Sequence, residues 1–558
     1  MTTKLKVGLI IDSQIVTKQT DHLIQQSLKS DLYDISYLII QESFHHKDNT
    51  LSKIFRYIRI NGLNKLIRSI TFKVIIKIES LFVKRRKPIF KDFFDKFDLE
   101  HYGIKTLVVR PNFSASGLVY RYAEDDLNKI KTLNLDLLVR SGSGILKGNI
   151  LEVCRNGIIS FHHGDNDLIR GGPPGFWEVF NKHKRTGFVI QLLKDELDGG
   201  DVIFKGFIPT SFMYTLNYVN LLTKANIFLH KAIESLASEK SKLKIFPKKP
   251  YEYPLYRVPK LSQQFKYLIG VLISSSVRGY RKLLRRNYRW GVAYQFVRNW
   301  DEVALWRSKK IKNPPNHFLA DPFIWYKNNS HYCFVEDYNY KTSIGCISVY
   351  QITKDGHKDL GIALKEPFHL AYPFLLESNG ELYMCPDTSH SKDIRLYKCI
   401  DFPLKWVFEM ILIKDVSASD TNIFYKNDKW WLLTNICSSD LGDHNSELHV
   451  FSSDELLSDT WKSHPKNPVI FDPLRARNGG MLFDQGNTYR VFQRQGWDFY
   501  GEAFGVSKIT GLTDSTYDEE LQFIVEPKFF EGIKGTHTYS FKSGLLAIDF
   551  VESGKNVN

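Results

Sequence analysis

Two residues capable of acid–base chemistry stand in the first half of the chain, where strands should give way to loops. His162 follows the apolar run 157–159, and Asp198, 36 positions later, follows a second apolar run, 188–193. Histidine exchanges a proton near neutral pH, and a nearby carboxylate can orient the ring and raise its basicity. The pair therefore predicts a site of acid–base chemistry at the ends of two strands.

The surrounding residues predict the elements that must position this pair. The turn-forming cluster 163–167 ends the first strand, and Pro173-Pro174 should open a helix that carries Phe176, Trp177 and Phe180, because proline is tolerated in a first helical turn. Upstream we expect a helix at 21–28 and strands at 4–12, 33–41, 105–109 and 135–139. Alternating strands and helices predict a mostly parallel sheet with its ligand cleft at the carboxyl ends of the strands.

Several short motifs accompany the pair in a fixed order. They are Leu135 to Val139, Gly144-Ile145-Leu146, Ser160-Phe161-His162, Arg170-Gly171, Thr186-Gly187 and Leu197 to Asp201. Over about residues 100–205 this order and spacing resembles the catalytic domain of the formyltransferases that use 10-formyltetrahydrofolate, such as methionyl-tRNA formyltransferase and the sugar N-formyltransferases.

The resemblance implies a reaction and a set of roles. In that family an amine attacks a formyl carbon, so the oxyanion needs a donor and the ammonium that forms needs a base. By resemblance, the catalytic positions are His162, Asp198 and Ser160. The positions next to the 10-formyltetrahydrofolate cofactor are Gly144, Ile145, Leu146 and Asp201.

Position 160 departs from the family, which has asparagine there. A serine hydroxyl is shorter and rotates freely, and losing such a donor generally costs about 2.7–4 kcal/mol of transition-state stabilisation. Either a neighbour such as Asn166 or His163 compensates, or the reaction is not formyl transfer. A plainer interpretation is that His162 and His163 only satisfy loop carbonyls.

Length and composition bound the remaining possibilities. At 558 residues, with 43% hydrophobic and 14% aromatic residues, the chain is folded and too long for one core. Its six cysteines are scattered without metal-binding spacing, so we expect a reducing cytoplasm and no metal site. The N-terminus lacks the apolar region of a signal peptide. Without a glycine-rich phosphate motif, we do not expect nucleotide hydrolysis or Rossmann redox chemistry.

The net charge of +15 is concentrated in two stretches. Residues 52–87 contain eleven Lys or Arg and one acid, and residues 253–300 contain ten Lys or Arg and no acid. Both are also apolar, yet neither has the ~18 uninterrupted apolar residues of a membrane-spanning helix. A basic helix with an apolar side fits the inner face of a membrane, where each Lys or Arg near anionic lipid is worth about 1 kcal/mol. A solvated basic face is the alternative, and nucleic acid is the least expected partner.

The second half repeats a phrase of one polar residue, a strand, a tight turn and a second strand. The heads of the five units are Asp321, Tyr372, Asp420, Arg477 and His537, spaced 51, 48, 57 and 60 residues apart. Such a period is typical of four-stranded propeller blades, so we expect a five-bladed propeller rather than a β-sandwich.

Inner strands of a propeller direct their leading residues into the central channel. One funnel should therefore gather substrate-binding residues, chiefly Asp321, Glu336, Asp420, Arg477 and His537, with Tyr372, Asp387 and Gln493 beside them. The repeated phrases resemble family 43 glycoside hydrolases and, more closely over about residues 290–552, the propeller domain of plant glucosamine inositolphosphorylceramide transferases. Sugar binding is the main expectation, and a carboxylate pair performing glycoside hydrolysis is the alternative.

We therefore expect a formyltransferase-like α/β domain at residues 1–240 with a basic helical insertion at about 50–95. A linker and a basic helix should follow at 241–289, and a five-bladed β-propeller at 290–555. The favoured function is transfer of a formyl or related acyl group to a nucleotide- or lipid-linked amino sugar in the synthesis of lipopolysaccharide or capsule. The alternatives are a glycan-binding scaffold with an inactive first domain, and a glycosidase or glycosyl-transferring site in the propeller. No sequence feature indicates an oligomeric state.

Overall fold

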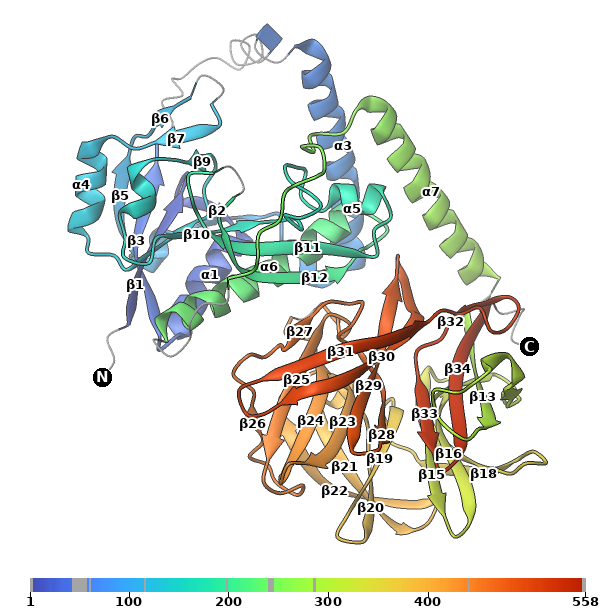
Figure 1. The fold of residues 1–558 in the computed structure, drawn as a ribbon. Helices are drawn as coiled ribbons and strands as arrows, with labels where there is room; N and C mark the ends of the chain where they lie inside the picture. Colours follow the sequence, from blue (N-terminus) through green and yellow to red (C-terminus); the bar gives the residue numbers. More distant parts are fainter. Residues whose placement is uncertain are drawn as a thin grey trace. The chain divides into compact units, whose positions relative to one another are not determined.

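The computed structural model describes residues 4–42, 58–59, 62–114, 117–196, 199–238, 245–284, 288–439 and 441–553. The chain divides into two compact units, Met1–Val271 and Leu272–Asn558. Figure 1 shows an α/β arrangement in the first unit and an all-β arrangement of several small sheets in the second. Each unit is described by itself below.

The first unit is built on a seven-stranded sheet in the order β12, β11, β10, β8, β1, β3, β5. Its strands are β1 (Leu5–Ile11), β3 (Tyr33–Gln41), β5 (Lys105–Val109), β8 (Leu137–Arg140), β10 (Ile158–His162), β11 (Arg185–Leu192) and β12 (Asp201–Pro209). The strands from β5 to β10 are parallel, whereas β11 and β12 pair antiparallel at one edge. The predicted, mostly parallel sheet is confirmed.

Six helices accompany this sheet in the described residues, and the last of them, α7, runs on into the second unit. They are α1 (Lys18–Lys29), α3 (Leu63–Arg86), α4 (Glu124–Thr132), α5 (Phe176–Phe180), α6 (Tyr214–Ala237) and α7 (Leu261–Leu283). On one face α4 packs through Leu127 and Ile130 against Ile10 and Leu138 of the sheet. Helix α6 contacts β11, β12 and α1. Short strands accompany the loops: β2 (Ile15–Thr17), β4 (Lys96–Asp98), β6 (Asn112–Phe113), β7 (Val119–Arg121) and β9 (Ile145–Leu146).

The helix expected to open at Pro173-Pro174 begins later. Gly175 has φ of 75°, a left-handed conformation that an α-helix cannot contain, and α5 starts at Phe176 after it. The Phe176 amide donates to the Pro173 carbonyl at 3.2 Å, so residues 173–175 form a turn. Phe176, Trp177 and Phe180 do lie on the helix, as predicted.

Five small sheets make up the second unit. Four are consecutive: β15 to β18 (His317–Lys327, Ser330–Asn339, Ile344–Ile352, His357–Leu364), β19 to β22 (Ala371–Ser378, Glu381–Asp387, Asp393–Asp401, Lys405–Lys414), β23 to β26 (Ala418–Lys426, Lys429–Ile436, Glu447–Ser453, Lys462–Ser463) and β28 to β31 (Asn478–Asp484, Asn487–Gly496, Phe499–Leu512, Tyr517–Val525). The fifth joins β33 (Tyr539–Lys542) and β34 (Leu545–Ser553) to β13 (Tyr288–Phe296) and β14 (Lys309–Lys310). Two further short strands pair at sheet edges, β27 (Ile470–Phe471) with β25 and β32 (Ile533–Gly535) with β34.

The five sheets form the closed ring of a propeller. Each innermost strand contacts the next, and the innermost strand of the fifth sheet, β33, contacts that of the first, β15. Residues 288–296 pair with residues 545–553, so the two ends of this unit share one blade. The turn after every inner strand has two residues at positive φ, such as Asn328 and Asn329 in the first blade, which is the turn geometry that suits right-handed strand twist. The predicted five-bladed propeller is confirmed.

Helices α3 and α7 carry much of the excess positive charge. Residues 52–57 and 60–61 of the first basic stretch and residues 285–287 of the second lie outside the described residues. None of the helices in the described part of the chain combines the length and the apolar character needed to span a bilayer.

A buried ion pair holds the fourth blade together. The Arg490 side chain is fully buried and donates to both carboxylate oxygens of Glu519, at 2.9 and 2.8 Å. It also donates to the carbonyls of Arg475 and Ala476, at 2.8 and 3.2 Å. Burial alone raises the pKa of Glu519, but Arg490 outweighs it and the pKa ends below its usual value.

We predict that Arg490→Met lowers the free energy of unfolding by about 3–5 kcal/mol, because it leaves the Glu519 carboxylate buried and unpaired. Urea unfolding followed by circular dichroism measures the change. In the wild type, the contribution of Glu519 is fully present above its unfolded pKa and is lost as pH falls through its depressed folded pKa. Lys312→Gln, at an exposed site of the same unit, is the control. Equal unfolding midpoints for all three proteins would contradict the prediction.

Candidate functional site

The first predicted site lies at the end of β10. The Nε2 atom of His162 lies 2.9 Å from the carbonyl oxygen of Ile169, so this nitrogen carries a proton and Nδ1 of the neutral ring is the acceptor. Asp198 lies outside the described residues. Ser160 is buried and accepts a hydrogen bond from Arg140 Nη1 at 3.3 Å. Arg140, at the end of the neighbouring strand β8, is therefore a cationic donor next to the position where the family has asparagine.

The two other neighbours that could stand in for the missing asparagine differ in character. His163 is half-buried, and loss of solvent around its ring lowers its pKa to about 3, so the ring is neutral. It stacks on Phe161 with the ring centroids 4.8 Å apart. Asn166 lines a cavity of about 270 Å³ that also contains Arg170, Lys205 and Lys248. His163 is thus a packed ring, and only Asn166 faces open space.

The predicted cofactor loop, residues 144–146, contains a strand at the edge of a small sheet. Gly144 adopts φ of 85°, and a Cβ there would come within 2.6 Å of the Tyr120 ring, so the loop needs glycine at this point. Ile145 is half-buried, and Leu146 packs into the core. Strand β9 is the edge of its three-stranded sheet. Asp201 is held by Lys194 at 2.5 Å and Lys248 at 3.3 Å, and the hydrogen bond from Lys194 is the main reason that its pKa is lowered.

The second predicted site is a cavity of about 510 Å³ in the propeller, which we call the funnel. It is lined by Trp290, Phe318, Ala320, Asp321, Glu336, Tyr338, Tyr340, His369, Ala371, Asp387, Asp420, Arg477, Tyr500 and His537. The five propeller residues singled out in the sequence are all among them, together with Asp387. Tyr372 is fully buried and donates to Asn422 at 2.8 Å, and Gln493 is fully buried and donates to Asp420 at 2.8 Å, so these two support the wall.

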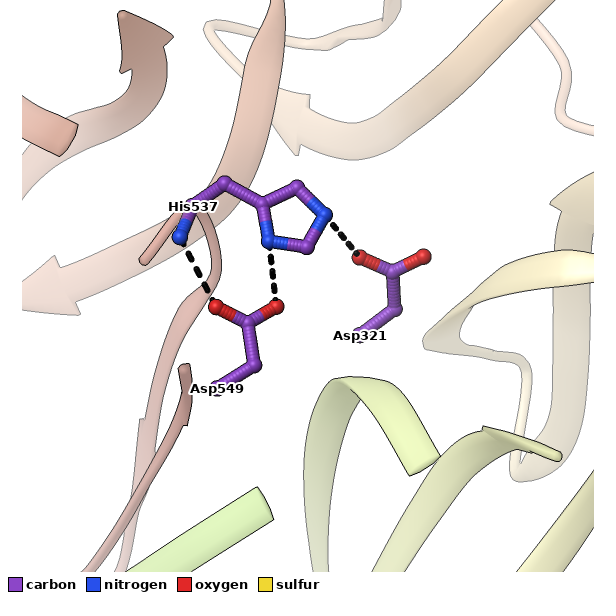
Figure 2. Close-up of side chains that lie close together, drawn as sticks. All are labelled: Asp321, His537 and Asp549. Atoms are coloured by element: carbon purple, nitrogen blue, oxygen red, sulfur yellow. Dashed lines mark hydrogen bonds and ion pairs between the residues drawn. The ribbon is translucent and has the colours of Figure 1, made fainter. Parts of the chain in front are cut away.

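Figure 2 shows His537 between two carboxylates, Asp549 and Asp321. Its Nδ1 lies 2.6 Å from Asp549 Oδ2, and its Nε2 lies 3.4 Å from Asp321 Oδ1. Asp549 is fixed in turn by the backbone amides of His537 and Thr538, at 2.8 and 3.1 Å. Burial by itself would lower the pKa of His537, but Asp549 outweighs it and raises the pKa. The two carboxylates therefore favour the protonated, imidazolium form of His537.

The opposite wall carries an arginine–carboxylate pair. Arg477 Nε donates to Asp420 Oδ2 at 2.6 Å, and its guanidinium lies 4.9 Å from the centroid of the Tyr500 ring. Burial raises the pKa of Asp420 to about 7 even against this arginine, because Asp387 and Asp321 repel the charge as well. Asp321 and Asp420 both have left-handed backbone at a bulge of the inner strand, with φ of 48° and 50°. Such a bulge directs the side chain away from the regular strand pattern.

Glu336 also faces the funnel, and among the funnel acids its negative charge is the least balanced by positive charge nearby. Its Oε1 lies 3.6 Å from His369 Nε2, while the Gly345 amide donates to His369 Nδ1 at 2.9 Å. His369 therefore accepts at Nδ1 and carries its proton on Nε2, and burial lowers its pKa. Burial, followed by Asp321 and Asp387, raises the pKa of Glu336 well above its usual value. Glu336 is thus a carboxyl group that a cationic ligand would help to ionise.

Four acids, Asp321, Glu336, Asp387 and Asp420, thus line the funnel together with one arginine and one charged histidine. Atoms of Asp321, His537 and Asp549 also lie within 4.8 Å of one another, close enough to hold a metal ion, although the hydrogen bonds described above already account for their positions.

Sequence reasoning missed several members of the site. Asp549 had a detectable signal: Glu336, Asp387 and Asn435 each lie fifteen positions after a blade head, and Asp549 occupies the matching second strand of the last blade. The aromatic rings of the site had no such signal in the sequence. Trp290 lies 4.1 Å from the His537 ring and Tyr500 lies 5.2 Å from it, and both come from strands far from the repeated phrase.

Together the two units define a chain that joins a formyltransferase-like α/β unit to a five-bladed propeller. Residues 302–554 match the family model described as glucosamine inositolphosphorylceramide transferase 1, N-terminal. The transferase of that name from Arabidopsis thaliana is 35% identical over 218 residues, which are 38% of this chain and 28% of that protein. Methionyl-tRNA formyltransferase of Bacillus subtilis (strain 168) is 26% identical over 195 residues, 34% of this chain and 58% of that protein.

Solved structures similar to the two units have lower identity. Zg3597, a family 117 glycoside hydrolase of Zobellia galactanivorans, is 12% identical with a TM-score of 0.32, over 48% of this chain and 91% of that one. Phosphoribosylglycinamide formyltransferase from Anaplasma phagocytophilum is 16% identical with a TM-score of 0.29, over 45% of this chain and 98% of that one. Both resemblances drawn from the sequence are confirmed, and the curated relatives of both units are named transferases. The chain covers only part of each curated relative's length.

We predict that His537 stays protonated well above pH 6.5, its ordinary pKa, because Asp549 and Asp321 favour the cation. Nitrogen-15 NMR of histidine-labelled protein measures this, with His537→Gln used to assign the signal. Asp549→Asn should move the titration toward lower pH. Because the folded pKa is raised, the stabilising effect of this group is fully present below its unfolded pKa and is lost as pH rises through the folded pKa. Titration at the ordinary value, unchanged by Asp549→Asn, would rule out the imidazolium.

Proposed function

We propose that the funnel binds an amino sugar through its ammonium group, and that the chain acts in the assembly of a cell-surface glycan such as lipopolysaccharide or capsule. The observation that carries this proposal is the excess of carboxyl groups over cations in the funnel. Raised pKa values of Glu336 and Asp420 indicate that burial and the neighbouring acids outweigh the cations of the funnel. A bound ammonium would supply a further positive charge and allow these carboxyl groups to ionise.

The walls of the funnel support the same ligand class. Trp290, Phe318, Tyr338 and Tyr500 present aromatic rings around a cavity of about 510 Å³. Ring faces pack well against the C–H faces of a sugar, and placed polar groups can fix its orientation. The plant relatives of the propeller are named for glucosamine, which is an amino sugar.

In a binding test, glucosamine should bind more tightly than N-acetylglucosamine, which has no charge at nitrogen. Glu336→Gln should weaken glucosamine binding about tenfold, since a hydrogen bond between charged groups is worth about 1.5–3 kcal/mol. Wild-type affinity should rise as pH rises through about 7, where Asp420 ionises. Isothermal titration calorimetry on the full chain measures all three.

The matched control is Glu409→Gln, at an exposed carboxylate on β22 of the same unit. It should leave glucosamine binding unchanged. Equal affinity for the two sugars, or an unaltered affinity in Glu336→Gln, would refute the ammonium assignment.

For the first unit we propose transfer of a formyl group to such an amine. Here 10-formyltetrahydrofolate, when bound, supplies the formyl carbon, and the loop at Gly144, Ile145 and Leu146 would hold it. His162 would accept the proton that the attacking amine loses, and Asp198 would orient the ring. Arg140, aimed at Ser160, is the donor that would stabilise the oxyanion in place of asparagine.

This role makes a prediction about three positions. His162→Ala and Asp198→Asn should abolish formation of N-formylglucosamine from glucosamine and 10-formyltetrahydrofolate without changing the circular dichroism spectrum. Ser160→Asn should increase it by restoring the amide donor. Mass spectrometry of the product measures the rates, and His101→Ala, at an exposed histidine of the same unit, is the control. Full activity in His162→Ala would end the assignment. If the wild type binds no folate, a glycan-binding scaffold becomes the better description.

A glycosidase or glycosyl-transferring reaction in the funnel is a second candidate, favoured by one observation. Glu336 has a strongly raised pKa and faces open space, as a general acid for a glycosidic oxygen would. If this reaction occurs, a glucosaminide substituted for the free sugar in the binding experiment would give new carbohydrate products.

We place the chain in the cytoplasm at the inner face of a membrane. Helix α3 supports this location, because exposed apolar residues follow one another along it every three or four positions, among basic residues: Leu63, Ile67, Ile70, Val74, Ile78 and Leu81. Helices of this kind lie in the interface of anionic bilayers.

A further inference from the structure

A second, larger cavity of the propeller unit, of about 1030 Å³, lies along the C-terminal half of α7. We call it the α7 groove. One wall is formed by Ile273 and Val277 of the helix, which are 59% and 45% exposed. Trp497 and Phe499 of the fourth blade and Tyr288 of β13 contribute further apolar surface. An apolar groove of this size is long enough to cover part of an aliphatic chain.

The α7 groove lies next to the funnel, and one residue lines both. Tyr340 lines both cavities, and its hydroxyl donates to the Tyr288 carbonyl at 3.2 Å. On the funnel side its ring lies 5.8 Å from that of Tyr338, and on the groove side Tyr288 packs edge-on against Phe499 at 5.1 Å. A row of aromatic rings therefore lies between the two cavities, which are adjacent.

The two cavities have opposite charge. The groove contains Arg278, Arg281, Lys282 and Lys341 and one acid, Asp498, which pairs with Arg278. The Arg281 guanidinium lies over the Tyr288 ring, 4.6 Å from its centroid. Among the described residues, the ammonium groups of Lys282 and Lys341 have no acidic partner within ion-pair distance. The groove thus offers cations next to an apolar wall, whereas the funnel offers carboxylates.

We propose that the α7 groove binds the phosphoryl-lipid part of a lipid-linked amino sugar whose sugar occupies the funnel. The sequence of surfaces matches such a molecule: carboxylates for the ammonium, cations for the phosphate and an apolar wall for the chain. Lys282 and Lys341 bind the phosphate oxygens, and Ile273 and Val277 cover the first part of the aliphatic chain. The identification of the sugar as cationic rests on the function proposed above, but the phosphate and lipid subsites do not.

The test uses the full chain and a probe without any sugar. Dodecyl phosphate, dodecyl maltoside and inorganic phosphate are titrated by calorimetry below the micelle concentration. Dodecyl phosphate should bind the wild type more tightly than either of the others. The double variant Lys282→Gln/Lys341→Gln should weaken its binding at least about tenfold, the order expected for lost charge-assisted contacts. Val277→Ser should weaken it too, by removing apolar wall.

The matched control is Lys312→Gln/Lys358→Gln, which removes two exposed cations of the same unit outside the groove and should change nothing. Equal binding of dodecyl phosphate to all variants would overturn the proposal. So would inorganic phosphate binding as tightly as dodecyl phosphate, which indicates a phosphate site alone. Binding only to phosphatidylserine vesicles and not to the monomeric probe would show a membrane-docking surface instead. Because no probe contains an amine, failure of the glucosamine experiment leaves this result intact, and the reverse also holds.

Discussion

The pairing of residues 288–296 with residues 545–553 is the constraint on which the candidate site in the propeller depends. It closes the ring, and it also brings the last blade's His537 and Asp549 to the first blade's Asp321. Trp290, on the closing strand itself, packs against the same histidine. Residues more than two hundred positions apart become neighbours only through this closure. The acidic funnel is therefore a property of the closed ring and of no single blade.

The funnel concentrates like charges at a cost to stability. Several carboxyl groups in one cavity repel each other, and burial adds to the penalty, which is why the pKa values of Asp321, Glu336 and Asp420 are all raised. Arg477 and the imidazolium of His537 offset part of this repulsion. Perturbed groups of this kind cluster at binding and catalytic sites, where the strain is relieved by the ligand. The fold tolerates the arrangement because pairs such as Arg490 with Glu519 are fully satisfied elsewhere in the propeller.

The sequence predicted the architecture well because both units repeat simple signals. Buried parallel strands appear in the sequence as apolar runs. Each propeller blade can be recognised by a polar residue at its start and a two-residue turn after its first strand. The predictions failed at residues whose conformation depends on tertiary contacts. Gly175 takes a left-handed conformation that delays α5, and Tyr372 turns from the expected channel into the core, where Asn422 accepts its hydrogen bond. Nor could spacing alone reveal that Arg140 lies against Ser160, since the two meet across neighbouring strands.

The distribution of charge along the chain follows from this arrangement. Most of the positive excess belongs to two stretches, and the second of them supplies three of the four cations of the α7 groove. Four acids of the propeller line the funnel. An evenly charged surface would attract either an anion or a cation, but separated fields of opposite sign favour a ligand that carries both charges in the same order.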